Sequence, residues 1–374
     1  GSNDLDVQER VSKYTSIKEF RSEDINYLKK KLRKIITIKT NDVNECMDLL
    51  NLGSSICQTG VADKTMMIGS LIFKIIGNDK INVMKSSNDE KYKMNKLLTI
   101  VIPSYKSKPK IIAHVKKISK KIPIIIVENS EDKILKIFLE KEHKNVKVFL
   151  KKNIGFGRAI NYGGKFVKTK YFFVMNPDTK IYNDTLANLT NAAKKIKNFG
   201  AISPEHISKK KKRIPDKKIE EKKTLTGGAM LFKTKTFKKI KGFDENIFLY
   251  YEDNDFFTRC RINNFKLYII NDSFHYHKKK NSSSATFKNF DEKNYAYLIA
   301  GWHGQWSKFY FLKKYHGYTY SFFKCAPRLV IMMFQLIINL VINAKKAKYT
   351  YFKIEGLFSS MIGLTAFKRS KYDH

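Results

Sequence analysis

Apolar runs and amphipathic stretches alternate along the chain from residue 96 onward. Four runs are continuously apolar, as buried parallel strands are, and they cover residues 97–102, 122–127, 146–150 and 171–175. The segments between them have the spacing of helices, over residues 110–120, 134–142 and 159–167. Because strands that alternate with helices form parallel sheets with helices on their faces, this pattern predicts an α/β domain over residues 96–300.

The two ends of the chain follow other patterns. Residues 3–93 contain two helical stretches, the first with Ile25, Leu28 and Leu32 on one face, and they hold no grouping of catalytic side chains. We expect a small helical module there that serves oligomerisation or docking, so a homo-oligomer is one assembly open to the chain. Residues 301–374 are expected to form a helical, membrane-proximal region.

That C-terminal region combines aromatic, basic and apolar segments. Residues 302–323 are rich in aromatic side chains, and the apolar residues 329–342 are followed by Lys345, Lys346 and Lys348. Aromatic and Lys residues that flank an apolar helix suit a membrane interface. The apolar stretch is shorter than the ~20 residues that a spanning helix needs. We therefore expect a helix that lies in the interface or packs on the α/β domain, rather than a span.

Composition and charge narrow the classes of partner. The 374 residues are 43% hydrophobic, which excludes a disordered chain, and 73 Lys and Arg against 34 Asp and Glu give a net charge of +39. Only nine of the basic residues are Arg, the residue that base readout favours, so an anionic membrane surface is a better candidate than specific nucleic acid. Four cysteines without CxxC spacing indicate neither a zinc site nor a disulfide framework. The N-terminus shows no signal-peptide pattern, and we expect a cytosolic or cytosol-facing protein.

Polar residues follow the predicted strands, where ligands bind in open α/β sheets. Asp178, in the tetrapeptide Asn176-Pro177-Asp178-Thr179, is placed to hold Mg²⁺ or Mn²⁺ through oxygen ligands, or else to cap the next helix in a turn. The loop at residues 153–158 links a strand to a helix, and its backbone amides and Arg158 suit a phosphate group. It lacks the GxGxxG spacing of a dinucleotide site.

A second group of candidates lies between residues 226 and 277. Acidic and aromatic residues alternate over 243–255, and if a helix begins near Glu252, Asp253 lies in its first turn, suited to general-base work or to capping. His275 and His277, after a predicted strand at 267–270, share one strand face and either complete a metal site or have no such role. Gly227 and Gly228 precede an apolar run, as in a close backbone approach to a ligand or a tight turn.

The order of these motifs is more specific than any one of them. It runs Ile100-Val101-Ile102-Pro103-Ser104-Tyr105, Glu128-Asn129-Ser130, Asn153-x-Gly155-Phe156-Gly157, Asn176-Pro177-Asp178-Thr179, Gly227-Gly228-Ala229-Met230, Gly242-Phe243-Asp244-Glu245 and Glu252-Asp253-x-Asp255. Over about residues 96–315 this order resembles the family 2 glycosyltransferases, especially their rhamnosyltransferase-like and galactofuranosyltransferase-like branch. The resemblance implies a GT-A-type nucleotide-sugar-binding sheet flanked by helices, a divalent metal and inversion at the anomeric carbon.

The resemblance implies roles on the donor side. Three residues match the first nucleotide-binding loop, namely Pro103, Ser104 and Tyr105. Three others match the loop that passes the ribose and the diphosphate, namely Asn153, Gly155 and Arg158. Glu128 and Asn129 stand where the family usually has Asp-Asn near the base and ribose, so Glu128 adds a methylene to the usual side chain.

The resemblance also implies the metal and acceptor sides. Asn176 and Asp178 occupy the DxD-type motif, with Asp178 as metal ligand and Asn176 in place of the first Asp, which leaves fewer negative ligands. His277 matches a histidine that often joins the metal, although His275 leaves that choice open. Asp253 matches the general base. The residues that line the donor sugar or the acceptor are Gly227, Gly228, Ala229 and Glu252.

The implied activity is transfer of a sugar from a dTDP- or UDP-linked donor to a saccharide or lipid-linked saccharide in cell-surface polysaccharide synthesis. Rhamnose is the first candidate for the sugar. The expected location of the protein is the cytoplasm, bound peripherally to the inner face of the cell membrane. A sugar-phosphate nucleotidyltransferase would need a Gly-rich motif after the first strand, and residues 104–107 contain no glycine. A non-enzymatic basic protein that binds an anionic polymer or membrane surface fits poorly with the acidic residues of 243–255.

Overall fold

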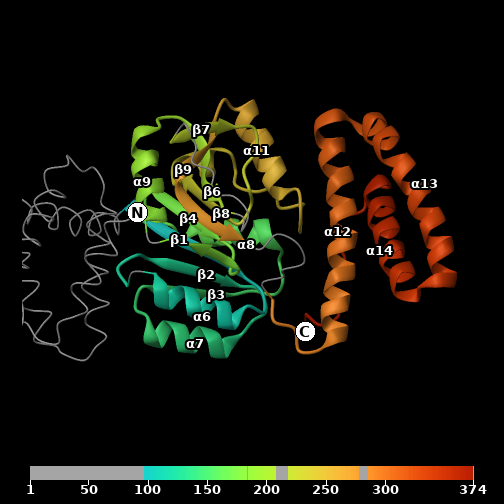
Figure 1. The fold of residues 1–374 in the computed structure, drawn as a ribbon, viewed down its shortest axis with the longest axis horizontal. Helices are drawn as coiled ribbons and strands as arrows, with labels where there is room; N and C mark the ends of the chain where they lie inside the picture. The colour runs from blue at the N-terminus through green and yellow to red at the C-terminus, as the bar shows by residue number, and fades with distance from the viewer. Residues whose placement is uncertain (1–96, 119, 183, 208–217, 278–284, 374) are drawn as a thin grey trace, which may run out of the picture. The chain divides into compact units, whose positions relative to one another are not determined.

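The computed structural model describes residues 97–118, 120–182, 184–207, 218–277 and 285–373 (Figure 1). All of them belong to one unit, Glu90–His374. The helical module expected over residues 3–93 lies outside the described residues.

Nine strands of the described residues form one sheet, in the order β3-β2-β1-β4-β8-β6-β9-β5, with β7 paired to β9. The first four strands are β1 (Leu98–Ser104), β2 (Ile124–Glu128), β3 (Val146–Leu150) and β4 (Tyr171–Met175). The others are β5 (Thr179–Ile181), β6 (Phe199–His206), β7 (Ile219–Lys222), β8 (Ala229–Lys233) and β9 (Lys266–His277). β1 to β4 are parallel, as the alternating pattern predicts, whereas β8 runs antiparallel to β4 and β6 and makes the sheet mixed.

Helices cover both faces of the sheet. Those of the α/β domain are α6 (Lys108–Lys117), α7 (Lys133–Glu142), α8 (Phe156–Lys165), α9 (Thr185–Lys195), α10 (Thr234–Lys239) and α11 (Glu252–Ile262). Helices were expected at 110–120, 134–142 and 159–167, and each is present with ends shifted by at most three residues. The expected helix start near Glu252 is confirmed.

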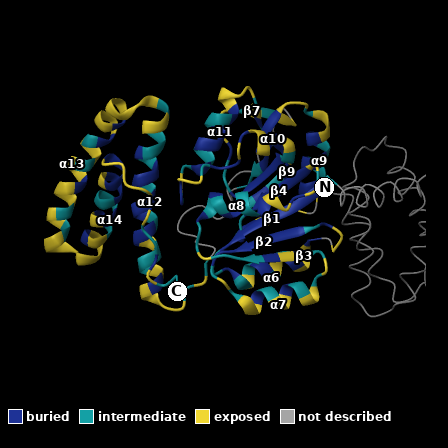
Figure 2. Ribbon diagram, turned by 180° about the vertical axis from the view of Figure 1, so that it is seen from behind, coloured by how far each residue is buried: buried dark blue, intermediate teal, exposed yellow. Residues whose placement is uncertain are grey.

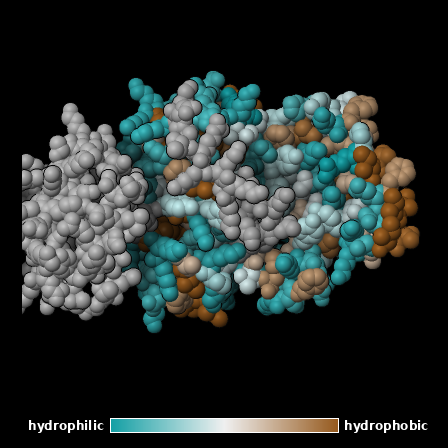
Figure 3. Space-filling model, in the orientation of Figure 1, coloured by the Kyte–Doolittle hydropathy of each residue, from teal (hydrophilic) through white to brown (hydrophobic). Residues whose placement is uncertain are grey.

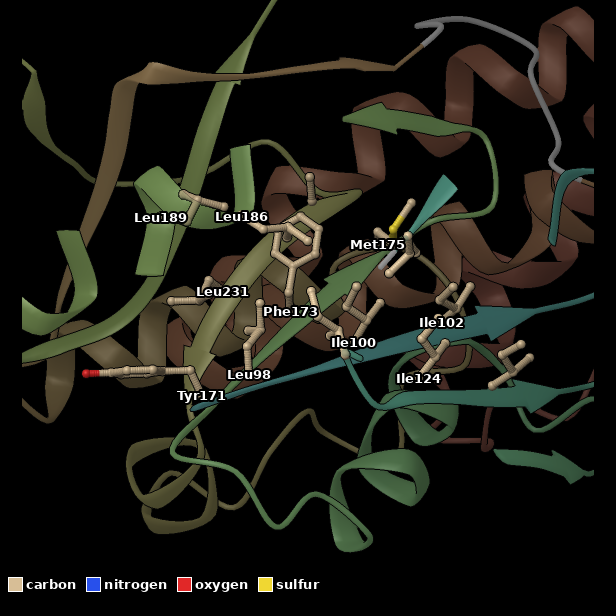
Figure 4. Close-up of a cluster of buried hydrophobic side chains, with 14 of the residues drawn as sticks. Leu98, Ile100, Ile102, Ile124, Tyr171, Phe173, Met175, Leu186, Leu189 and Leu231 are labelled. Carbon is tan, nitrogen blue, oxygen red and sulfur yellow. The ribbon is translucent and has the colours of Figure 1, made fainter. Parts of the chain in front are cut away.

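Alternation along the strands divides the core into two layers. Leu98, Ile100 and Ile102 of β1 point to one face, where α6, α7 and α9 supply Ile111, Leu135 and Leu189 among other residues (Figure 4). Val101 points to the opposite face, where α8, α10 and α11 pack. Because both faces are covered, the central strands are buried throughout their length (Figure 2). The sheet edge where β1, β2 and β4 end is therefore fixed from both sides.

Three long helices follow: α12 (Phe290–His316), α13 (Tyr318–Ile342) and α14 (Ala344–Met361). α12 passes through residue 300 without a break, so the boundary expected there falls inside a helix. Trp302, Trp306 and Phe309 are core residues of this helical group, and their expected placement at a membrane interface is wrong. The reason is a close helix crossing: a Cβ on Gly356 of α14 would lie 2.2 Å from the carbonyl oxygen of Trp302.

α13 is longer than the apolar stretch predicts. Its 25 residues begin in the aromatic segment at Tyr318 and continue through Pro327. Among the described residues it is the one helix long and apolar enough to cross a membrane, and only 11% of its most apolar window is buried. Its buried residues are Ser321, Cys325 and Met332, and it packs on α12 and α14 rather than on the sheet. Its other side is exposed and apolar (Figures 2 and 3).

Candidate active site

The ends of β1 and β2 and the loop after β3 are bonded to one another. The backbone N–H of Asn129 donates to the carbonyl of Ser104 over 2.7 Å, and the Asn129 amide donates to the carbonyl of Gly155 over 3.3 Å. The Gly155 N–H in turn donates to the Asn153 side chain over 3.3 Å. Four of the predicted donor-binding residues are thus adjacent. The Asn129 Oδ1 is buried and accepts no hydrogen bond from the described residues, so it is open to a ligand donor.

Glu128 ties β1 to β2. Its buried carboxylate accepts the hydroxyl of Ser104 on one oxygen, and on the other it accepts the hydroxyl and the backbone N–H of Ser130, the latter over 2.8 Å. Both oxygens are therefore engaged within the protein. Glu128 thereby fixes the ends of β1 and β2, which Tyr105 and Asn129 follow directly. Pro103 is buried in the same pair of strands.

The end of the chain also reaches this sheet edge. The Tyr105 hydroxyl donates to the carboxylate of Asp373, and the Asn153 amide donates to its other oxygen over 3.2 Å. Burial, and then the bond to Asp373, raises the pKa of Tyr105. The Lys106 ammonium donates to the Tyr372 carbonyl over 2.8 Å and forms an ion pair with Glu292 of α12. Sequence reasoning missed this segment, because no local pattern marks a contact across more than two hundred residues.

Arg369 of the same segment lies beside the 153–158 loop. Its guanidinium is 3.9 Å from the ring centroid of Phe248, whose carbonyl accepts the Phe156 N–H over 3.1 Å. Burial, and then the charge of Arg158, lowers the pKa of Arg369. Within the described residues neither guanidinium forms an ion pair, and Arg158 donates from Nε to the Glu245 carbonyl. Two neighbouring guanidiniums of this kind favour an anion between them.

The acidic side chains of residues 243–255 differ in their partners. Asp244 and Asp255 both bind Lys314 of α12 over 2.6 Å, and Asp255 also pairs with Arg259 over 2.8 Å. These two carboxylates hold α11 and its preceding loop to α12. Glu245 accepts the amide of Asn161 over 3.1 Å at an exposed position. Glu252 is buried and Asp253 is partly buried, and neither forms an ion pair with any described residue, so these two acids are the candidates for chemistry.

Glu252 and Asp253 begin α11 after a pair of left-handed residues, Tyr250 and Tyr251, each with φ of 66°. One oxygen of Asp253 accepts the N–H of Asn254 over 2.8 Å. Burial raises the pKa of both carboxyls, and the charge of Asp253 raises that of Glu252 further. The Glu252 Oε2 is buried without a partner among the described residues. A raised pKa makes a carboxylate a stronger base, which suits proton abstraction.

The two glycines join this acidic pair to the DxD-type turn. Gly228 has φ of 118°, and its carbonyl accepts the Asn176 N–H over 2.8 Å and the Thr179 hydroxyl over 3.0 Å. A Cβ on Gly227 would lie 3.2 Å from Oδ2 of Asp253. Ala229 continues into β8 opposite Met175. The sequence-predicted metal motif and base therefore meet at one turn.

The residues of the 176–179 turn fit a divalent ion. The Asn176 Oδ1 is buried and has no hydrogen-bond partner among the described residues, and Asp178 adds a carboxylate two residues later. No group of three His, Cys, Asp or Glu side chains gathers within the part of the chain that the structure describes. Mg²⁺ commonly takes one or two carboxylates and completes its shell with phosphate and water, so two protein oxygens suffice.

Strand register bears on the two histidines. β9 continues past the predicted end at residue 270 to His277, which pairs with Thr179 next to Asp178. His275 pairs instead with Ile181, and its buried ring lies 5.2 Å from that of His206. The register therefore favours His277 over His275 as the neighbour of Asp178. A residue that sequence reasoning missed, His114, contacts the Pro177 carbonyl over 2.6 Å and supports the turn.

Comparison with known proteins finds a family match within the α/β domain. Residues 99–269 match the family model for Glycosyl transferase family 2. The uncharacterized glycosyltransferase RT0329 of Rickettsia typhi is 29% identical over 174 residues, which cover 40% of this chain and 54% of the relative. The chain thus spans about half the length of this curated relative. The family match agrees with the sheet and its flanking helices, and the expected GT-A-type α/β class is confirmed.

Two solved structures are similar to this chain at low sequence identity. The mannosyltransferase PcManGT of Pyrobaculum calidifontis, in complex with GDP-Man and Mn²⁺, has a TM-score of 0.44 and 11% identity, over 71% of this chain and 86% of that one. S. aureus TarS 1-349 in complex with UDP-GlcNAc has a TM-score of 0.41 and 14% identity, over 72% and 92% of the respective chains.

Proposed function

Because residues 99–269 match the family model for Glycosyl transferase family 2, we propose that the chain transfers a sugar from a nucleotide-diphosphate donor to an acceptor hydroxyl with inversion. The observation that carries this proposal is the Gly227–Gly228 turn. Gly228 binds the Asn176–Thr179 turn, and Gly227 lies against the Asp253 carboxylate. A diphosphate-binding motif and a base are thus held at one point, as a single displacement at the anomeric carbon requires.

We assign the donor side to the sheet edge. Asn129 and Asn153 are our candidates for the nucleoside, supported by the Asn129 Oδ1, which accepts no hydrogen bond from the described residues. Arg158 and Arg369 are our candidates for the diphosphate. We take dTDP-rhamnose as the first candidate donor and UDP-linked sugars as the second, because the motif order resembles the rhamnosyltransferase-like branch.

The acid–base work falls to Asp253. Its carboxylate takes the proton of the acceptor hydroxyl as that oxygen bonds to the anomeric carbon and the bond to the diphosphate oxygen breaks. The departing diphosphate gains negative charge, which the guanidiniums of Arg158 and Arg369 stabilise. Glu252 is buried beside Asp253, and burial, followed by the charge of Asp253, raises the pKa of Glu252.

Asp178 and Asn176, with His277 as the third candidate, would hold Mg²⁺ or Mn²⁺. The ion, when bound, supplies positive charge to the leaving diphosphate. The turn itself is fixed by protein contacts from His114 and Gly228, so its oxygen ligands are held in place by the fold.

The proposal extends to the membrane. The exposed residues of α13 include Val330, Phe334, Ile338 and Val341, and Lys345 and Lys346 follow its end. Apolar side chains with flanking Lys suit an anionic membrane surface. We place the enzyme at the inner face of the cell membrane, acting on a saccharide or lipid-linked saccharide during cell-surface polysaccharide synthesis.

Flotation with vesicles tests the membrane contact. Wild type should float with vesicles of phosphatidylglycerol and phosphatidylcholine, and Phe334→Asp with Ile338→Asp should not. Ile134→Asp, at an exposed apolar position on α7, is the matched control and should float as wild type does. Flotation of the double variant at the wild-type level would contradict the membrane role of α13.

The transfer activity is tested by ligand binding first. Thermal shift with dTDP, UDP and their sugars, with and without Mn²⁺ or Mg²⁺, should show a metal-dependent rise in melting temperature for one nucleotide. The absence of a shift with every nucleotide and metal would overturn the donor site. Acceptor screening with the nucleotide sugar that binds then measures transfer itself.

A further inference from the structure

Beside the Glu252–Asp253 pair lies a group of aromatic and cationic side chains that donor binding does not use. It consists of Tyr250, Tyr251, Tyr297, Arg328, Tyr349 and Lys353, hereafter the aromatic–cationic cluster. The first two residues precede Glu252, Tyr297 lies on α12, Arg328 on α13, and Tyr349 and Lys353 on α14. Four separate elements thus supply one cluster.

Glycines on one side of α12 make room for it. A Cβ on Gly301 would lie 2.6 Å from the Tyr349 ring and 3.3 Å from the Lys353 side chain, and a Cβ on Gly304 would lie 3.6 Å from the Tyr250 ring. Gly301 and Gly304 are three residues apart and so share a helix face. The tyrosine rings of α14 and of the pre-α11 turn therefore lie side by side along α12.

Two rings of the cluster, Tyr250 and Tyr297, are exposed to solvent. Tyr297 and Tyr349 stack with centroids 4.4 Å apart and planes 15° from parallel. The Lys353 ammonium is 5.2 Å from the Tyr349 centroid. Tyr250 is 45% exposed and Tyr297 is 52% exposed, so both offer free ring surface. Stacked aromatic rings of this kind bind the C–H faces of sugar rings.

The cluster holds two cations and no compensating acid of its own. Lys353 is half-buried, and burial and then the charge of Arg328 lower its pKa. The charge of Arg328 also acts on Tyr251 and Tyr349. Among the ion pairs of the described residues, none includes Arg328 or Lys353. Two neighbouring cations, one of them partly removed from water, are stabilised by a bound anion.

We propose that the aromatic–cationic cluster is the acceptor subsite, and that it takes a saccharide that carries a phosphate or diphosphate. Tyr250 and Tyr297 contact the sugar ring, and Arg328 and Lys353 bind the phosphate. The subsite rests on the proposed glycosyl transfer, because Tyr250 is three residues from Asp253 and so brings the acceptor to the base. The charge of Glu252 acts on Tyr250, in agreement with this proximity.

A phosphate beside a sugar has two sources, a lipid-linked saccharide or a soluble phosphorylated glycan. Arg328 lies on α13 one helical turn before the exposed apolar residue Ile331, which in turn lies one turn before the exposed Phe334. A hydrocarbon chain attached to the phosphate would meet Ile331 first and could continue along the exposed apolar side of the helix. The lipid-linked source therefore fits the structure better.

Three probes separate these sources: farnesyl diphosphate, inorganic pyrophosphate and farnesol. Each is titrated by calorimetry into the full chain, after saturation with the nucleoside diphosphate and Mn²⁺ identified by thermal shift. Farnesyl diphosphate should bind, and Arg328→Gln with Lys353→Gln should weaken it at least tenfold without changing nucleotide affinity. Lys238→Gln, at an exposed position on α10, is the matched control and should bind as wild type does. If the double variant does not fold, the single variant Arg328→Gln, at an exposed position, replaces it in the same titrations.

The outcomes are separable. Equal binding of pyrophosphate and farnesyl diphosphate, lost in the variant, supports the phosphate site with a soluble source. Tighter binding of farnesyl diphosphate supports the lipid-linked source. The subsite is overturned if neither phosphate probe binds wild type, if the variant binds them unchanged, or if farnesol alone binds as well. Loss of nucleotide binding in wild type would instead mark failure of the proposed donor site, since the cluster residues do not contribute to it.

Discussion

The Asp253 carboxylate lies against the backbone of Gly227, so closely that a Cβ at position 227 would be 3.2 Å from Oδ2. The next residue, Gly228, bonds to the Asn176–Thr179 turn through its carbonyl. Through these contacts the proposed base and the proposed metal motif share a single support. Displacement of one should therefore disturb the other.

Gly227→Ala should lower the transfer rate at least tenfold, because the added methyl group pushes the Asp253 carboxylate away from its place. Stability should change by less than about 1 kcal/mol, since Gly227 is not among the residues with positive φ. Gly228→Ala is the comparison: its φ of 118° disfavours a side chain and should cost about 1–3 kcal/mol. Steady-state kinetics and thermal unfolding check both. A fully active Gly227→Ala enzyme would contradict the shared support.

Asp253→Asn should leave donor binding intact and lower transfer by roughly 10²–10⁴, because the amide cannot take the acceptor proton. Nucleotide affinity from calorimetry and transfer rate from product formation are measured on the same preparation. Asp291→Asn, at an exposed position in the first turn of α12, should behave as wild type in both. Turnover near the wild-type level in Asp253→Asn would remove Asp253 from the base role.

The pKa values of Glu252 and Asp253 predict how stability and activity depend on pH. Both are raised, chiefly by burial. A carboxyl with a raised pKa in the folded state contributes stability that is fully present below its unfolded pKa and is lost as pH rises through the folded pKa. Activity should follow the opposite course and increase over that range, because the base acts when deprotonated.

Glu252→Gln isolates the part of this effect that belongs to Glu252. At neutral pH the variant should melt at a higher temperature than wild type, because a neutral amide replaces a buried acid without an ion pair. The difference should vanish below about pH 4, where the Glu252 carboxyl is protonated in both states. Melting temperature against pH gives the result. An equal difference at every pH would mean that packing, and not ionisation, separates the two proteins.

Local patterns predicted the parts of this molecule that depend on neighbours in sequence. The strands β1 to β4 follow from continuous apolar runs, and Asp253 was placed in the first turn of α11 from residue order alone. β9 was predicted too short, because Asn271 and Ser273 are polar. In the fold the Asn271 N–H donates to the Lys218 carbonyl and the Ser273 hydroxyl donates to the Thr185 carbonyl, so the strand continues.

Contacts between distant segments were beyond the reach of these patterns. Trp302 and Trp306 resembled interfacial residues, and only the close passage of Gly356 shows that they are core. Likewise, Arg369 and Asp373 belong to no sequence motif. Only their contacts in the fold bring them to the site: Arg369 with the Phe248 ring and Asp373 with the Tyr105 hydroxyl. Chemistry at a strand end is readable from a motif, whereas a partner from the end of the chain is not.

Asp178→Ala should weaken nucleotide-sugar binding at least tenfold in the presence of Mn²⁺ and have little effect without it, because Asp178 is the proposed carboxylate ligand. Addition of EDTA to wild type should reproduce the loss and have no further effect on the variant. Asp184→Ala, which lies before α9 and makes no side-chain cap bond, is the control and should retain metal-dependent binding. Equal donor affinity in Asp178→Ala and wild type would exclude Asp178 as the ligand.

Arg369→Ala should weaken binding of the nucleoside diphosphate about tenfold or more and leave the affinity for the free nucleoside unchanged. The reason is that the guanidinium lies over Phe248 beside Arg158, where the diphosphate is proposed, while Asn129 and Asn153 are the residues proposed to hold the nucleoside. Arg369→Lys keeps the charge but loses the planar fork, so it should retain part of the affinity. Lys371→Ala, an exposed neighbour over the Tyr295 ring, controls for general loss of positive charge. Calorimetry with nucleoside and nucleoside diphosphate provides both affinities. If Arg369→Ala weakens the two ligands equally, the residue supports the fold of the C-terminal segment and does not bind the diphosphate.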